Sequence, residues 1–135
     1  AALHGGFAMI TKNPMQLKAF IKNKAAEKLE TVLSRNIANT RPRDYYDIHI
    51  LYTLRGAECD KATLCRALER TTQKRGSSMI LTDYPEIMKE IRESDSLRKL
   101  WEKYSREYEY AKDISFDDTC NTIQTIFDRC ELNTK

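Results

Sequence analysis

The chain has 135 residues, of which 32% are charged and 41% hydrophobic, and its formal net charge is +3 at pH 7. This length fits one domain with a core of useful size, and the composition is typical of an ordinary soluble globular protein. The positive charge is too small to indicate nucleic-acid binding by itself. No run of 18 apolar residues is present, so we expect no membrane-spanning helix.

The first residues are expected to lie outside the fold. The opening AALHGGFAM is small and apolar, and it lacks the basic segment of a signal peptide. We interpret residues 1–16 as a vector remnant or ragged edge, and residues 17–135 as a single helical domain.

Helical signals follow in chain order. Residues 17–21 are the only plausible strand, and residues 22–36 then carry apolar side chains at the spacing of one helix face. Asn36 can adopt the left-handed conformation that ends such a helix. Pro42 suits the first turn of a second helix, which is expected to run to Arg55 and stop at Gly56.

Four more helices are predicted downstream from their caps and apolar stripes. A third follows Asp60, a fourth starts near Asp83, and a fifth follows Asp95. A sixth begins with Ser115 and Asp118, whose spacing is that of a capping box. The sequence therefore predicts an all-α bundle of about six helices, with at most one or two short strands near the N-terminus.

The four cysteines indicate buried thiols rather than a zinc site. They are Cys59, Cys65, Cys120 and Cys130, and no pair has C-x-x-C spacing. The even count permits disulfides. Three of the four, however, fall on apolar helix faces, so we expect reduced cysteines in a cytoplasmic protein.

Two carboxylates stand out on the second predicted helix. Asp44 and Asp47 share one helix face with Ile48 and Leu51. Carboxylates so placed could bind Mg²⁺ or receive arginines from a neighbouring helix. Alternatively, Asp44 only caps its helix, and Asp47 pairs with one of the nearby arginines Arg35, Arg41 and Arg43.

The preceding helix offers cationic side chains. Lys28, Thr31 and Arg35 line one polar side of it. A lysine and an arginine at this spacing can hold triphosphate oxygens, the first as a point charge and the second as a fork. The alternative is a solvated face in which Glu27 or Glu30 makes local ion pairs.

Two further patterns are weaker. Arg43 and His49 form an R-x5-H spacing that resembles the motif of HEPN-type ribonucleases, although such a histidine can equally be a packed side chain. Aromatic residues at helical spacing could stack nucleobases or simply belong to the core; they are Trp101, Tyr104, Tyr108 and Tyr110.

A longer stretch carries a more specific resemblance. The segment AAEKLETVLSRNIANTRPRDYYDIHIL resembles the AbiEii/AbiGii-type toxin nucleotidyltransferases, which carry A-E-K-[LF]-E, S-R and N-T-R-x-[RK]-D-x-Y-D-[IL] motifs. The later segments DYPEIMKEIRESDSLRKLWEKY and YAKDISFDDT are similar to that family's C-terminal helices. The resemblance covers roughly residues 17–127. Pro42 and His49 depart from the residues common at their positions.

The resemblance implies a fold, a chemistry and a set of residues. The family has a polymerase-beta-like fold and transfers nucleotides from an NTP with Mg²⁺, in known cases to RNA such as tRNA. By position, Lys28 and Asp44 correspond to active-site residues. Nucleotide-binding roles are expected for Arg35, Arg41 and Arg43, and Asp47 is a possible second carboxylate.

One family motif is absent from the sequence. The upstream G-S…D-x-[DE] motif supplies the metal-binding carboxylates of the family, and the 135 residues contain none. We therefore expect the C-terminal, helical part of such an enzyme, inactive alone and without a metal site of its own. It would act in phage abortive infection or with a cognate antitoxin. The alternatives are a metal-independent HEPN-like ribonuclease and a non-catalytic helical binding module.

Overall fold

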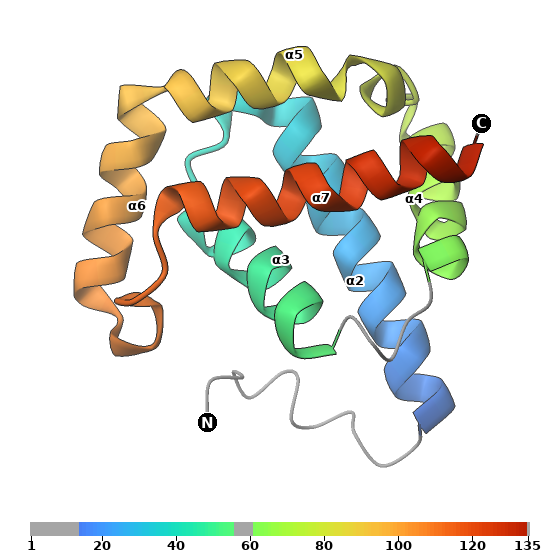
Figure 1. Cartoon of the computed structure of the whole chain (residues 1–135), viewed down its shortest axis with the longest axis horizontal. Helices are drawn as coiled ribbons and strands as arrows, with labels where there is room; N and C mark the ends of the chain where they lie inside the picture. The colour runs from blue at the N-terminus through green and yellow to red at the C-terminus, as the bar shows by residue number, and fades with distance from the viewer. Residues whose placement is uncertain (1–13, 56–60, 135) are drawn as a thin grey trace.

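Six helices form the part of the chain that the structure describes, and no strand occurs in it (Figure 1). The computed structural model describes the backbone of residues 14–55 and 61–134 and the side chains of 22–54 and 62–130. The helices are α2 (Pro14–Arg35), α3 (Pro42–Arg55), α4 (Lys61–Arg75), α5 (Ile80–Glu93), α6 (Asp95–Glu107) and α7 (Phe116–Thr134). Two 3₁₀ turns, η1 (Asn36–Ala38) and η3 (Glu109–Ala111), join them. The predicted all-α bundle is confirmed.

The strand predicted at residues 17–21 is wrong, because these residues belong to α2. The sequence offers a reason for this. Leu17, Ile21 and Ala25 continue the four-residue spacing of Leu29 and Leu33, so one helical period runs through the whole segment. Pro14 occupies the first helical position, where its missing N–H is not needed.

Helices α2 and α3 form a hairpin that positions the candidate site. Asn36 ends α2 with a φ of 50°, which confirms its predicted left-handed conformation. The side chain of Asn39 is buried, and its Oδ1 accepts a hydrogen bond of 3.2 Å from the backbone N–H of Arg41. The chain is therefore held at the point where it turns into α3.

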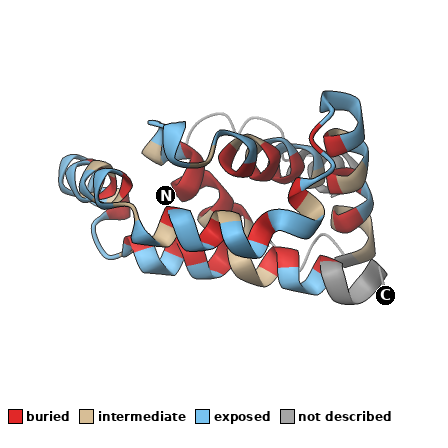
Figure 2. Ribbon diagram, turned by 90° about the horizontal axis from the view of Figure 1, so that it is seen from above, coloured by how far each residue is buried: buried red, intermediate tan, exposed pale blue. Residues whose placement is uncertain are grey.

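The core lies between this hairpin and α7, which packs across α3, α4 and α5 (Figure 1). Buried residues gather on the inward faces of the helices (Figure 2). The last predicted helix is α7, and the five residues at helical spacing that form its inward stripe are all buried: Phe116, Cys120, Ile123, Phe127 and Cys130.

Reduced thiols were predicted for the cysteines, and for one pair this is wrong. Cys65 of α4 and Cys130 of α7 form a disulfide with a Cα–Cα distance of 5.4 Å. Cys120 remains a free, buried cysteine. Cys59 lies outside the described residues.

The helix starts agree in part with the predictions. The capping box is confirmed, since the Asp118 N–H donates to Ser115 Oγ at 2.9 Å and the Ser115 N–H donates to Asp118 Oδ2 at 3.0 Å. The predicted cap Asp95 is wrong, because Ser94 accepts from the Leu97 N–H. α5 begins at Ile80, earlier than predicted, with i→i+3 hydrogen bonds in its first turn. The Asp60 cap lies outside the described residues.

No described helix is both long enough and apolar enough to cross a membrane.

Candidate functional site

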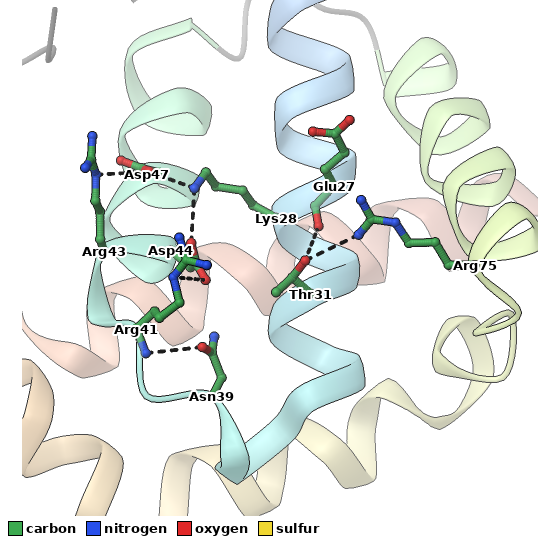
Figure 3. Close-up of polar contacts among 9 residues, drawn as sticks. All are labelled: Glu27, Lys28, Thr31, Asn39, Arg41, Arg43, Asp44, Asp47 and Arg75. Carbon is green, nitrogen blue, oxygen red and sulfur yellow. Dashed lines mark hydrogen bonds and ion pairs between the residues drawn. The ribbon is translucent and has the colours of Figure 1, made fainter. Parts of the chain in front are cut away.

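Lys28 bridges two carboxylates of the neighbouring helix (Figure 3). Its Nζ lies 3.0 Å from Asp44 Oδ1 and 3.0 Å from Asp47 Oδ2. The two carboxylates are three residues apart on α3, so both face α2, and Lys28 reaches them from the middle of that helix. The structure thus brings together three of the residues that the sequence singled out. We refer to Lys28, Asp44 and Asp47 as the charged triad.

The charged triad is largely removed from solvent. Asp44 and Asp47 are each 3% exposed, whereas the Lys28 side chain is 22% exposed. Burial alone would lower the pKa of Lys28, but hydrogen bonds to Asp47 and Asp44 more than offset this and raise it. The ammonium therefore stays charged at neutral pH, and its partial exposure makes it reachable from solvent.

Each carboxylate keeps one buried oxygen without a hydrogen-bond partner. These atoms are Asp44 Oδ2 and Asp47 Oδ1. Buried carboxylate oxygens normally accept hydrogen bonds, and an unmade one is costly. The triad therefore retains acceptor capacity that its own lysine does not use.

Two exposed arginines border the triad. Arg41 Nε lies 4.0 Å from Asp44 Oδ2, and Arg43 Nε lies 3.8 Å from Asp47 Oδ2. Their side chains are 63% and 60% exposed, so both guanidinium groups present N–H donors to solvent. For Asp47 the expected pair with a nearby arginine is therefore present, with Arg43. The group that reaches Asp47 from the neighbouring helix is Lys28, where Mg²⁺ or an arginine was the other expectation. Arg35 is also exposed, and its side chain makes no hydrogen bond or ion pair with another described residue.

Sequence reasoning missed a second ion pair beside the triad. Glu30 is buried, accepts a hydrogen bond of 2.6 Å from Arg75 Nη1 and another of 2.8 Å from Ser77 Oγ. Arg75, which lies on the other side of α2 from Asp44 (Figure 3), also contacts Thr31. Glu30 thus belongs to a buried contact between α2 and the end of α4, not to a solvated face. The partners are 45 positions apart in the sequence, so no local pattern indicated the pair.

The described residues do not form a complete magnesium site. No group of three or more His, Cys, Asp or Glu side chains there could hold a metal ion. In the charged triad, the ammonium of Lys28 already takes the position between the two carboxylates that a bridging cation would need. Magnesium prefers near-octahedral oxygen coordination, which two carboxylates paired with a lysine do not offer.

Arg43 and His49, the suggested ribonuclease pair, contact different parts of the molecule. Arg43 pairs with Asp47 beside α2, whereas His49 Nδ1 lies 2.8 Å from Thr122 Oγ1 of α7. No hydrogen bond or other contact joins the two side chains in the described part of the chain. The geometry therefore gives no support to a shared active site for them.

His49 should make the fold sensitive to acid. Burial lowers its pKa, while the charge of Asp118 acts in the opposite direction. The unfolded chain then takes up a proton at a higher pH than the folded chain. The contribution of neutral His49 to the free energy of unfolding should be fully present above the ordinary histidine pKa of about 6.5. It should be lost as the pH falls through the lowered pKa of His49 in the folded chain.

The measurement is urea unfolding of the wild type and of His49→Gln at pH 7.5 and at pH 5. The wild type should lose more stability than His49→Gln, which cannot titrate there. Equal losses in the two proteins would show that His49 does not control this acid response.

The aromatic residues are divided between core and surface. Trp101 and Tyr104 are buried, and Trp101 Nε1 donates a hydrogen bond of 2.9 Å to the Ile114 carbonyl. Tyr108 is 43% exposed and Tyr110 is half-buried. The core interpretation therefore holds for Trp101 and Tyr104, and in part for Tyr110, which packs against the core, but not for Tyr108.

Comparison with known proteins identifies a family. The model of the family described as "Nucleotidyl transferase AbiEii toxin, Type IV TA system" matches residues 24–128, which includes α3 to α6 and most of α2 and α7. No curated protein and no solved structure matches the chain. The matched segment contains the whole charged triad and both bordering arginines. Because the match extends over more than half of the sequence, the chain belongs to the AbiEii nucleotidyl transferase toxin family.

Proposed function

We propose that the chain supplies the helical side of a nucleotidyl transfer site, with an NTP as donor and RNA, for example tRNA, as acceptor. The observation that carries the proposal is the charged triad: a charged, partly exposed Lys28 held by two buried carboxylates and bordered by two exposed arginines. The family match supports the reaction class. In this proposal Lys28 contacts the triphosphate, and Asp44 and Asp47 position Lys28.

The chemistry follows from the charges. In nucleotide transfer, a hydroxyl oxygen of the acceptor attacks the α-phosphorus of the NTP, and pyrophosphate leaves with the bonding electron pair. Negative charge therefore builds up on the leaving group. An ammonium has three N–H donors, and Lys28 uses two for Asp44 and Asp47. The third can bind a phosphate oxygen, and because Lys28 is already held in place, little reorganisation is needed.

The arginines extend this phosphate contact. The Nε atoms of Arg41 and Arg43 lie 4.0 and 3.8 Å from the carboxylate oxygens of Asp44 and Asp47, which is too far for a hydrogen bond. Their guanidinium groups therefore remain able to bind phosphate oxygens bidentately. Arg35 adds a further exposed positive charge at the end of α2. The magnesium that accompanies the triphosphate needs ligands other than the triad, such as a D-x-[DE] pair, which this sequence does not contain.

The proposal also includes a cellular role and a partner. The protein would act in the cytoplasm as the toxin of a toxin–antitoxin pair, or in phage defence, with a cognate antitoxin as its partner. The family description names a type IV toxin–antitoxin system and so supports this assignment.

The test is an assay with labelled NTPs, Mg²⁺ and tRNA, using the complete gene product and the 135-residue chain alone. We expect labelled tRNA from the complete gene product, none when EDTA removes the metal, and none from the chain alone. Metal-independent cleavage of the RNA that disappears in His49→Ala would instead favour the ribonuclease alternative. Incorporation of labelled nucleotide into tRNA by the isolated chain would show that its own residues suffice for metal binding.

A further inference from the structure

A cluster of tyrosine rings continues from the charged triad to the surface. Tyr46, which directly precedes Asp47 in α3, packs against Tyr110 with ring centroids 4.7 Å apart. Tyr110 also packs against Tyr108 at 5.4 Å, and its hydroxyl lies 2.9 Å from that of Tyr104. Buried rings thus support two outer rings, which belong to the turn between α6 and α7.

The outer rings are held rigidly. Tyr108 ends α6 and begins η3, and its backbone N–H donates to the Tyr104 carbonyl at 3.0 Å. Its carbonyl accepts from the N–H of Ala111, which is fully buried. The Tyr104 and Tyr108 rings pack with centroids 4.8 Å apart. Tyr108 nevertheless leaves 43% of its surface exposed, so a large ring is kept ordered where solvent can reach it.

This cluster lies close to the charges of the site. Burial and the hydrogen bond with Tyr110 raise the pKa of Tyr104; the charge of Asp47 adds to this and that of Arg43 acts in the opposite direction. The same carboxylate contributes to the raised pKa of Tyr46, after burial and Tyr110. Because Arg43 pairs with Asp47, which directly follows Tyr46, its exposed guanidinium lies close to this cluster.

We propose that Tyr108 and Tyr110 form a stacking platform for unpaired nucleobases of the acceptor RNA, with Arg43 binding the adjoining phosphate. Sequence-tolerant recognition of single strands combines aromatic rings for the bases with a cation for the backbone. Tyr108 is 43% exposed and Tyr110 beside it is half-buried, so the two neighbouring rings can contact two successive bases. An NTP has only one base, which favours the acceptor over the donor. This inference rests on the proposed function, because it assigns the acceptor of the same site.

The test measures binding without catalysis. A fluorescently labelled eight-nucleotide single-stranded RNA is titrated with the complete gene product at low salt, without metal or NTP, and anisotropy is recorded. Because a base stacked on an aromatic ring loses that contact when the ring is removed, Tyr108→Leu should weaken binding by roughly tenfold. Tyr108→Phe keeps the ring and should bind within about twofold of the wild type. Tyr52→Leu, the same change on a half-buried tyrosine of α3 outside this cluster, should leave binding unchanged.

The inference would be overturned by no RNA binding by the wild type, by equal binding by Tyr108→Leu, or by equal losses in Tyr108→Leu and Tyr108→Phe. Displacement of the RNA by excess NTP through a Tyr108-dependent contact would assign the platform to the donor base and also contradict it. A protein partner that covers Tyr108, together with an RNA affinity that does not change when Tyr108 is replaced, would also contradict the inference. RNA binding that depends on Tyr108, in a protein that transfers no nucleotide, would support the platform and refute the proposed function alone.

Discussion

Replacing Lys28 by alanine should destabilise the chain by about 3 kcal/mol, because two buried carboxylates would lose their shared cation. Asp44 and Asp47 are each 3% exposed, and each already has one oxygen without a hydrogen-bond partner. We expect the lower end of the range for broken buried pairs, since Lys28 is partly exposed and both bordering arginines remain. Urea unfolding at pH 7 measures this loss.

The matched variants separate charge from packing. Lys24→Ala, one turn earlier on α2 and exposed, should change stability by less than about 0.5 kcal/mol. Asp44→Asn keeps the Lys28–Asp47 pair and should cost only about 1 kcal/mol. A Lys28→Ala protein as stable as Lys24→Ala would contradict this account.

Reducing the Cys65–Cys130 disulfide should lower the free energy of unfolding by about 4 kcal/mol in the chain-entropy model, because it closes a loop with a sequence separation of 65. For a chain of this size the melting temperature should fall by about 10 °C or more. The measurement is thermal unfolding with and without dithiothreitol. The cytoplasm keeps thiols reduced, so the reduced protein would be the relevant form at the cytoplasmic location proposed above.

A cysteine double variant is the control. Cys65→Ala/Cys130→Ala cannot form the bond, so its melting temperature should not respond to the reductant. Burial raises the pKa of Cys120 to about 11, so this thiol stays protonated at neutral pH and does not exchange with the disulfide. If dithiothreitol does not change the melting temperature of the wild type, the result would contradict the assignment of the Cys65–Cys130 disulfide.

Local signals predicted much of the fold. The ends of α3, the left-handed Asn36 and the Ser115–Asp118 capping box depend on neighbours within a few residues, and the structure confirms each. The prediction of a strand at residues 17–21 was wrong because five residues are too few to distinguish a helical from an extended period. The helix is evident only when those residues are considered together with Ala25, Leu29 and Leu33.

The site was predictable only in part. Helical spacing placed Asp44 and Asp47 on one face, but it could not show that a single lysine bridges both. The Glu30–Arg75 pair and the Cys65–Cys130 bond join residues 45 and 65 positions apart. Such contacts depend on how whole helices pack, and cysteines can pair only if their Cα atoms come within about 7 Å. No local pattern contains that information.

The most direct test of the central claim, that Lys28 contacts the triphosphate, is the single-turnover rate of nucleotide transfer by Lys28→Ala in the complete gene product. The rate is measured well below the melting temperature of the variant, so that the protein is folded, and is compared with that of Lys24→Ala. We predict a rate about 10²-fold or more below wild type for Lys28→Ala and a near-normal rate for Lys24→Ala. A folded Lys28→Ala protein that transfers nucleotides at the wild-type rate would contradict the claim and leave the charged triad as an ion pair that only holds α2 and α3 together.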